Sequence, residues 1–106
     1  MNPKDIIETE IAKKLKANPE KASAVNAVVV MDITGDDGGQ WTIDCTKPGA
    51  EVKTGGTDGA NLTVTMAAND FVDMYNKTLS SQQAFFAGKV KVKGDVSLAL
   101  KLGNIL

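Results

Sequence analysis

The chain has 106 residues, 42% of them hydrophobic and 24% charged, and its net charge is −1. This length accommodates one domain, and so small a net charge argues against a general nucleic-acid binder. The absence of histidine removes the commonest general base and metal ligand, and the single cysteine, Cys45, excludes an internal disulfide.

The N-terminal segment is predicted to form a helix. Asn2 followed by Pro3 is a favourable helix start, and Asp5 stands where a capping box places an acid. The pair Asn18-Pro19 ends the helix and begins a short turn through Ala22. Residues four apart form an apolar stripe on one face, namely Ile7, Ile11 and Leu15 with Ile6 beside them.

Four segments in the middle of the chain alternate apolar and polar residues, which predicts strands. They are Ala27 to Thr34, Gln40 to Thr46, Ala50 to Lys53 and Asn61 to Met66. The inward residues by this alternation are Val29, Met31, Ile33, Trp41, Ile43, Cys45, Val52, Leu62, Val64 and Met66. Glycine-rich turns connect the strands, and the loop Thr54 to Gly59 precedes the fourth.

The next segment is predicted to be a helix that Asn69 caps and that carries Phe71, Met74 and Tyr75. The last third of the chain, Ser80 to Leu106, contains a short helix, a strand and an amphipathic helix. Each of these elements has its own start and stop signals.

Ser80 or Ser81 can cap the short helix, which carries Ala84, Phe85 and Phe86 and which Gly88 ends. Lys89 to Lys93 alternates lysine with valine, so Val90 and Val92 should face inward. Gly94 ends this strand and Asp95 caps the last helix. Leu98, Leu102 and Ile105 lie on one face of that helix.

The strands come in a block and the helices are segregated, which predicts an α+β fold with one sheet face covered. We expect a single domain over residues 1–106.

Three groups of residues invite a chemical function. Asp32, Asp36 and Asp37 lack the spacing of a calcium loop, so a solvated hairpin is the better interpretation. The glycine-rich loop at residues 55–59 leads into a strand, not into a helix N-terminus, which argues against phosphate binding. Cys45 has no histidine to activate it. We therefore expect no metal, no cofactor and no catalytic residues.

Four lysines form the one concentrated basic surface, Lys89, Lys91, Lys93 and Lys101. Lysines on an exposed edge strand discourage unwanted pairing. The same charges would attract an anionic membrane surface. The two interpretations are compatible, and both remain open at this point.

The run AFFAGKVKVKGDVSLALKL, from Ala84 to Leu102, closely resembles the C-terminal signature of the sterol carrier protein type 2 family, the nonspecific lipid-transfer proteins. A second run, LTVTMAANDFVDM from Leu62 to Met74, is similar to the family's strand-then-helix element. The two runs occur in the family's order and spacing, and the resemblance covers essentially all of residues 1–106.

This resemblance implies a five-stranded mixed sheet with its helices on one side and a lipid tunnel between the two layers. From composition alone the apolar residues would simply be the core, whereas family members leave part of that space unfilled. The implied lipid-binding residues are Met31, Ile33, Trp41, Ile43, Leu62, Val64, Met66, Phe71, Met74, Phe85, Phe86, Leu98, Leu102 and Ile105.

The function that the resemblance implies is non-catalytic intracellular binding and transfer of fatty acids, fatty acyl-CoA, sterols or phospholipids. Leu98, Leu102, Ile105 and Leu106 would form a mobile C-terminal wall. The alternative is an accessory or dimerisation module of a peroxisomal-type β-oxidation enzyme. We expect a monomer, with a dimer as the alternative, and transient membrane contact. The chain ends in Asn104-Ile105-Leu106 and lacks the family's peroxisomal tripeptide, so a peroxisomal and a cytosolic location both stay open.

Overall fold

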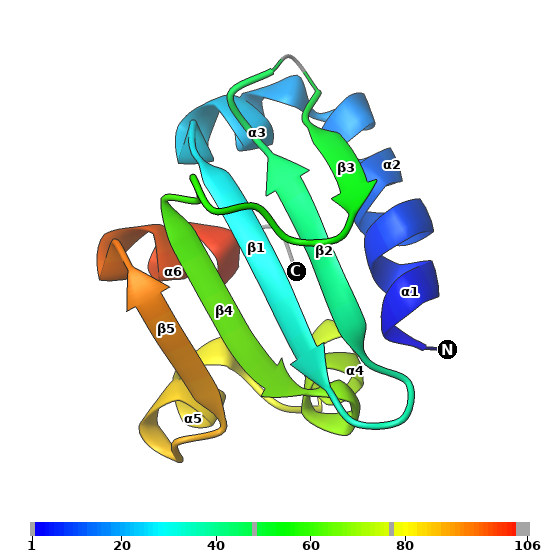
Figure 1. Ribbon diagram of the computed structural model, residues 1–106, viewed down its shortest axis with the longest axis vertical. Helices are drawn as coiled ribbons and strands as arrows, with labels where there is room; N and C mark the ends of the chain where they lie inside the picture. Colours follow the sequence, from blue (N-terminus) through cyan, green and yellow to red (C-terminus); the bar gives the residue numbers. More distant parts are fainter. Residues whose placement is uncertain (1, 48, 77, 104–106) are drawn as a thin grey trace.

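Five strands form one mixed sheet in the computed structural model of the chain (Figure 1). It describes residues 2–47, 49–76 and 78–103, apart from the side chains at positions 81, 82, 85, 99, 100, 102 and 103. The strands are β1 (Val28–Thr34), β2 (Gly39–Asp44), β3 (Glu51–Thr54), β4 (Leu62–Ala67) and β5 (Val90–Gly94), in the spatial order β3-β2-β1-β4-β5. The central pair β1 and β4 is parallel, and every other pair is antiparallel.

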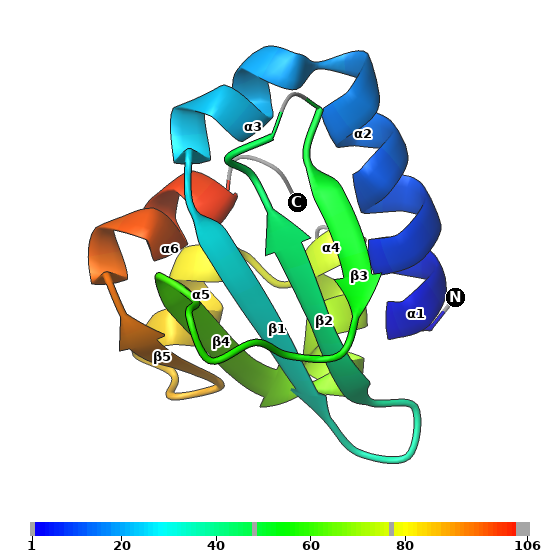
Figure 2. The same cartoon turned by 45° about the horizontal axis from the view of Figure 1, so that its top comes forward.

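The helices lie mainly on one side of this sheet. A continuous N-terminal helix consists of α1 (Pro3–Asp5), the π-helical stretch η1 (Ile6–Ile11) and α2 (Ala12–Ala17). The others are α3 (Pro19–Val25), α4 (Ala68–Tyr75), α5 (Ser81–Phe86) and α6 (Val96–Gly103). In Figures 1 and 2, α4, α5 and α6 lie behind the sheet, and the N-terminal helix runs along its β3 side. The predicted α+β fold with a five-stranded mixed sheet is confirmed.

Side-chain caps start three of the helices where the sequence indicates them. The Asp5 N–H donates to Asn2 Oδ1 at 2.9 Å. The Gln83 N–H donates to Ser80 Oγ at 3.1 Å, and the Ser80 N–H donates back to Gln83 Oε1 at 3.4 Å. This reciprocal pair is a capping box, in which two free donors of the first turn are satisfied together. Asp95 Oδ1 accepts from the N–H of Ser97 at 3.0 Å and starts α6.

Two local predictions were wrong. The segment after Asn18 is a full helix, α3, and not a short turn through Ala22. Pro19 at the first helical position and the helix-forming residues after it favour this outcome. Helix α4 begins at Ala68 without a side-chain cap, so Asn69 lies inside its first turn. Strand β4 passes directly into this helix, which leaves no turn for a capping residue.

The connection from β3 to β4 crosses the outer face of the sheet, opposite the helices (Figures 1 and 2). The Gly55 N–H donates to the carbonyl of Gln40 at 2.7 Å, and the Thr42 hydroxyl donates to the Gly55 carbonyl at 2.7 Å. Under this connection Thr42 and Val30 are buried although they face away from the helices. The strand order requires such a crossing because β2 and β1 lie between β3 and β4.

Candidate functional site

The inner face of the sheet is a continuous apolar surface. The strand register aligns its side chains in three rows that cross the sheet. The rows are Ile43–Val29–Leu62, Trp41–Met31–Val64–Val92 and Ile33–Met66–Val90. Because each strand alternates its side chains between two faces, this alignment gathers nearly every apolar residue of the sheet on the side of the helices.

The helices complete this apolar layer from the other side. Phe71 and Met74 come from α4, Ala84 from α5 and Leu98 from α6, and all four belong to one buried cluster with the sheet residues. Burial is complete at Phe71 and slightly less at Met74 and Leu98. Val90 and Val92, at the β5 side, are only half-buried. Val52 on β3, at the opposite edge of the sheet, is also half-buried, so the layer is less covered at its two edges than in the middle.

Two hydrogen bonds fasten the N-terminal helix to this layer. The indole N–H of Trp41 donates to Glu8 Oε2 at 3.0 Å, while the ring itself is buried. The hydroxyl of Tyr75 donates to Glu10 Oε2 at 3.4 Å, and Lys14 Nζ lies 5.1 Å from the centre of the same ring. Partial burial and the nearby Glu10 carboxylate raise the pKa of Tyr75. These contacts hold polar groups at the edge of an otherwise apolar layer.

Asn61 joins the starts of β1, β4 and α6. Its side-chain Oδ1 accepts from the Val28 N–H at 2.9 Å, and its own N–H donates to the Val28 carbonyl at 2.8 Å. Its carbonyl accepts from the Asp95 N–H at 3.0 Å. Gly94 approaches so closely that an added Cβ would lie 2.3 Å from the Asn61 oxygen. This junction sets where α6 begins against the sheet.

Cys45 is buried at the end of β2 and belongs to the same apolar cluster. Burial, with a smaller contribution from Asp44, raises the pKa of its thiol from an ordinary 9.0 to about 11. The thiol is therefore neutral at physiological pH, which is the unreactive form.

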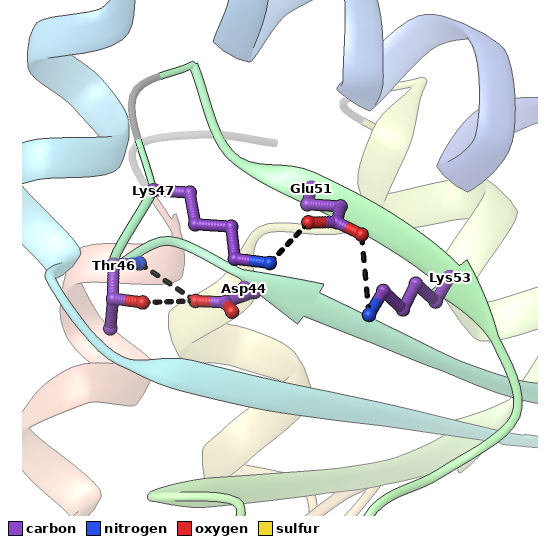
Figure 3. Close-up of polar contacts among 5 residues, drawn as sticks. All are labelled: Asp44, Thr46, Lys47, Glu51 and Lys53. Atoms are coloured by element: carbon purple, nitrogen blue, oxygen red, sulfur yellow. Dashed lines mark hydrogen bonds and ion pairs between the residues drawn. The ribbon is translucent and has the colours of Figure 1, made fainter.

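Each charged group at the β2–β3 turn has a partner within the turn (Figure 3). Asp44 accepts from the backbone N–H and the hydroxyl of Thr46, which lowers the pKa of its carboxyl group. Glu51 pairs with Lys47 at 2.5 Å and with Lys53 at 3.2 Å. These exposed pairs organise a turn and present no cleft for acid–base chemistry.

A surface pocket of about 270 Å³ lies at the other end of the sheet, beside the β1–β2 hairpin. Its lining includes two carboxylates and an amide, and its residues are Pro3, Asp37, Ala68, Asn69, Val72 and Asp73. None of the predicted lipid-binding residues lines it. Within the described part of the chain, no three potential metal-ligating side chains (His, Cys, Asp or Glu) come together.

The structure brings most of the predicted lipid-binding residues into one buried cluster. These are Met31, Ile33, Trp41, Ile43, Leu62, Val64, Met66, Phe71, Met74 and Leu98. Phe86 is instead 85% exposed at the end of α5. The side chains of Phe85 and Leu102, and all of Ile105, lie outside the described residues. Whether the clustered residues bind lipid stays a prediction.

Several members of the layer were not among the predicted site residues. The N-terminal helix contributes Ile6, Ile7, Ile11 and Leu15, all essentially inaccessible to solvent. Their four-residue stripe was visible in the sequence, but the resemblance concerned segments further along the chain. The strand alternation predicts that Val29 faces inward, and it lies between Ile43 and Leu62.

The fold and the apolar layer define a small α+β protein, in which apolar side chains from one sheet and from its helices pack together between them. None of the helices described here has both the length and the apolar character that a membrane crossing needs. Residues 8–106 match the model of the SCP-2 sterol transfer family, and the chain belongs to this family.

Two proteins with similar sequences support this assignment. The chain is 38% identical over 88 residues to mouse hydroxysteroid dehydrogenase-like protein 2, covering 82% of this chain and 18% of that protein. It is 32% identical over 105 residues to human sterol carrier protein 2, covering 95% and 19% respectively. The chain thus spans about a fifth of the length of these two relatives.

The solution structure of palmitated SCP2L2 from Aedes aegypti has the same fold. It matches with a TM-score of 0.81 and 30% identity, covering 99% of this chain and 94% of that one.

Proposed function

We propose that this domain binds the hydrocarbon part of a lipid between its sheet and its helices and carries it between membranes. The observation that supports this most directly is the continuous apolar layer, built from three aligned rows on four strands and covered by several helices. Membership of a sterol transfer family and similarity to a palmitated protein point to the same ligand class.

The energetics favour long ligands. Each buried methylene contributes roughly 0.8 kcal/mol, so about ten of them contribute roughly 8 kcal/mol. Association costs about 4–15 kcal/mol, which a short acid cannot offset. A fatty acid, a fatty acyl-CoA, a phospholipid or a sterol has enough apolar surface. Because one methylene discriminates weakly, the selectivity within this class is broad.

We propose that the ligand lies in a tunnel against Trp41, Met31 and Val64 in the central row, with Phe71 and Met74 opposite. Met31, Met66 and Met74 suit this task because flexible thioethers adapt to ligands of different shape. Leu98 belongs to α6, which packs against β4 and β5 at one edge of the layer.

The domain itself breaks no bond in this proposal. Its sequence has no histidine, and its one thiol is neutral at physiological pH. We propose an intracellular site of action, peroxisomal or cytosolic, and a monomeric domain. These points rest on the family resemblance.

A second candidate is an accessory module of a larger enzyme. The chain's similarity to hydroxysteroid dehydrogenase-like protein 2, of which it spans 18%, favours this alternative. In this case the domain would dock to a catalytic partner or dimerise. Concentration-dependent sedimentation without affinity for lipid would favour it.

The test is a titration with a fluorescent long-chain fatty acid, monitored through the emission of Trp41, the chain's single tryptophan. We expect a saturable response to long-chain lipids and none to a short-chain acid of the same headgroup. Native mass spectrometry of the purified protein should detect a bound lipid. Lack of a saturable response to every long-chain lipid would contradict the proposal.

A further inference from the structure

We propose that the β5 side of the molecule is a docking surface for membranes that contain anionic phospholipids. This inference rests on the lipid-transfer function proposed above. The surface, called the basic edge here, consists of Lys91 and Lys93 on β5, with Phe86 of α5 and Val96 of α6 near its two ends.

The register directs two lysines of the basic edge away from the apolar layer. Lys91 pairs with Thr65 and Lys93 with Thr63, so both lysines lie on the outer face while the intervening valine faces inward. Both are exposed, and residues two apart on a strand are about 7 Å from each other. This spacing allows each lysine to contact a different lipid phosphate.

These charges are not neutralised locally. Among the described residues, Lys91 and Lys93 have no ion-pair partner, whereas their neighbour Lys89 pairs with Asp70 at 3.6 Å. The carboxylate of Asp95 accepts hydrogen bonds from Ser97, and these bonds, with a smaller contribution from the charge of Lys101 on α6, lower its pKa.

The other nearby acid, Asp32, lies two strands away from β5 and accepts a hydrogen bond from the hydroxyl of Thr65 at 3.5 Å. The basic edge therefore presents a net positive charge.

Two exposed apolar side chains flank these lysines. Phe86 is 85% exposed and Val96 is 52% exposed, and they are the large apolar residues that the described structure leaves in solvent. Phe86 ends α5 just before β5, and Val96 begins α6 just after it, so they mark the two ends of the strand (Figure 1).

Protection of an edge strand explains the lysines but not an exposed phenylalanine. Cations beside apolar side chains are instead typical of a surface that lies at a membrane interface. The position also suits lipid transfer, because the inward-facing Val90 and Val92 of β5 are only half-buried at this edge of the apolar layer. A domain docked by its basic edge would hold these two valines close to the membrane.

The test measures binding to phosphatidylcholine vesicles with and without phosphatidylserine. We expect a preference for the anionic vesicles that weakens with salt. Each lysine near such a surface contributes about fivefold in affinity, so Lys91→Gln combined with Lys93→Gln should lower binding about 25-fold.

The matched control is Lys13→Gln combined with Lys21→Gln. It removes the same charge from exposed positions on α2 and α3, and it should change binding by less than about threefold. Lys91→Arg with Lys93→Arg keeps the charge and should bind like the unaltered protein. Phe86→Ser should lower binding to anionic vesicles about tenfold.

Equal losses in the control and the β5 double variant would overturn the inference, as would indifference to phosphatidylserine. A third result would also overturn it: the protein is a dimer, the β5 substitutions dissociate that dimer, and the protein shows no preference for anionic vesicles. In that case a second copy of the chain would occupy the basic edge. Fatty-acid affinity is measured in parallel without vesicles. A protein that binds fatty acid but no vesicles contradicts only the docking surface, and one that binds vesicles but no lipid contradicts the proposed function.

Discussion

Trp41 illustrates how one residue serves two environments. Its ring lies in the central row of the apolar layer, and its N–H reaches Glu8 on the N-terminal helix at 3.0 Å. A buried indole needs a partner for its N–H, and a carboxylate at the rim supplies one. The alternation of the strand predicts that Trp41 faces inward. It does not identify Glu8, because the two residues are 33 positions apart.

We expect Cys45 to resist alkylation in the folded protein. With its pKa raised to about 11, its thiolate fraction near pH 8 is about 100-fold smaller than that of a thiol with the ordinary value of 9.0. The rate of reaction with iodoacetamide, compared between native and urea-unfolded protein, measures this. Equal rates in the two states would contradict the burial of the thiol.

The same shift makes stability depend on alkaline pH. The folded state holds the thiol proton more tightly than the unfolded state, so the stabilisation is fully present below pH 9 and is lost as the pH rises towards 11. Relative to Cys45→Ala, the free energy of unfolding should fall by about 2–3 kcal/mol over this window. Urea denaturation at several pH values measures it, and parallel curves for the two proteins would refute it.

Gly94→Ala should destabilise the domain by about 3 kcal/mol or more. The backbone at Gly94 has φ +110°, and a Cβ there would lie 2.3 Å from the Asn61 carbonyl oxygen. The control is Gly59→Ala, where no atom lies within 4 Å and the change should stay below about 0.5 kcal/mol. Chemical denaturation of both variants gives the comparison, and similar losses would show that the junction tolerates a side chain.

At the scale of elements, the connection between β3 and β4 covers part of the sheet's outer face. It lies across β2 and β1 (Figure 2), and the buried residues Val30 and Thr42 are next to its glycines. Gly55 in this connection has φ +95°, a backbone conformation that residues with a side chain rarely adopt. The sequence predicted a glycine-rich loop here but not its path, which follows from the order of the strands.

Thr42→Val tests this role. The change keeps the shape and β-branching of the side chain but removes the hydroxyl that donates to the Gly55 carbonyl at 2.7 Å. We expect a loss of about 1–2 kcal/mol in the free energy of unfolding, because a partly buried carbonyl loses its partner. Thr63→Val, on the same face of β4, is the control and should change stability by less than about 0.5 kcal/mol. Thermal and urea denaturation of both variants measure the difference.

For the whole molecule, the two-layer arrangement gathers most of the large apolar side chains that the structure describes between the sheet and the helices. A ligand that binds there binds the folded state alone, so it must raise the stability of the entire domain. At a free concentration of about 100 times its Kd, a long-chain fatty acid should stabilise the fold by about 2.7 kcal/mol. For a domain of this size the Tm should rise by about 10 °C.

Thermal melts with increasing palmitate measure this effect, with a short-chain acid at the same concentration as the control. A Tm that does not respond to palmitate at saturating concentration would argue that the layer is a filled core. The α+β fold would remain, without a lipid-binding role.

Local signals in the sequence determined the types of most elements and the inward face of each strand. Strand periodicity, and caps such as those of Asn2, Ser80 and Asp95, depend on residues only a few positions apart. They can therefore be predicted from short segments of the sequence. The family resemblance implied the mixed sheet and its helical cover. Only the tertiary structure decided the path of the β3–β4 connection, the partner of Trp41 and the exposure of Phe86. Those features depend on segments far apart in sequence, and no local pattern specifies which distant surfaces meet.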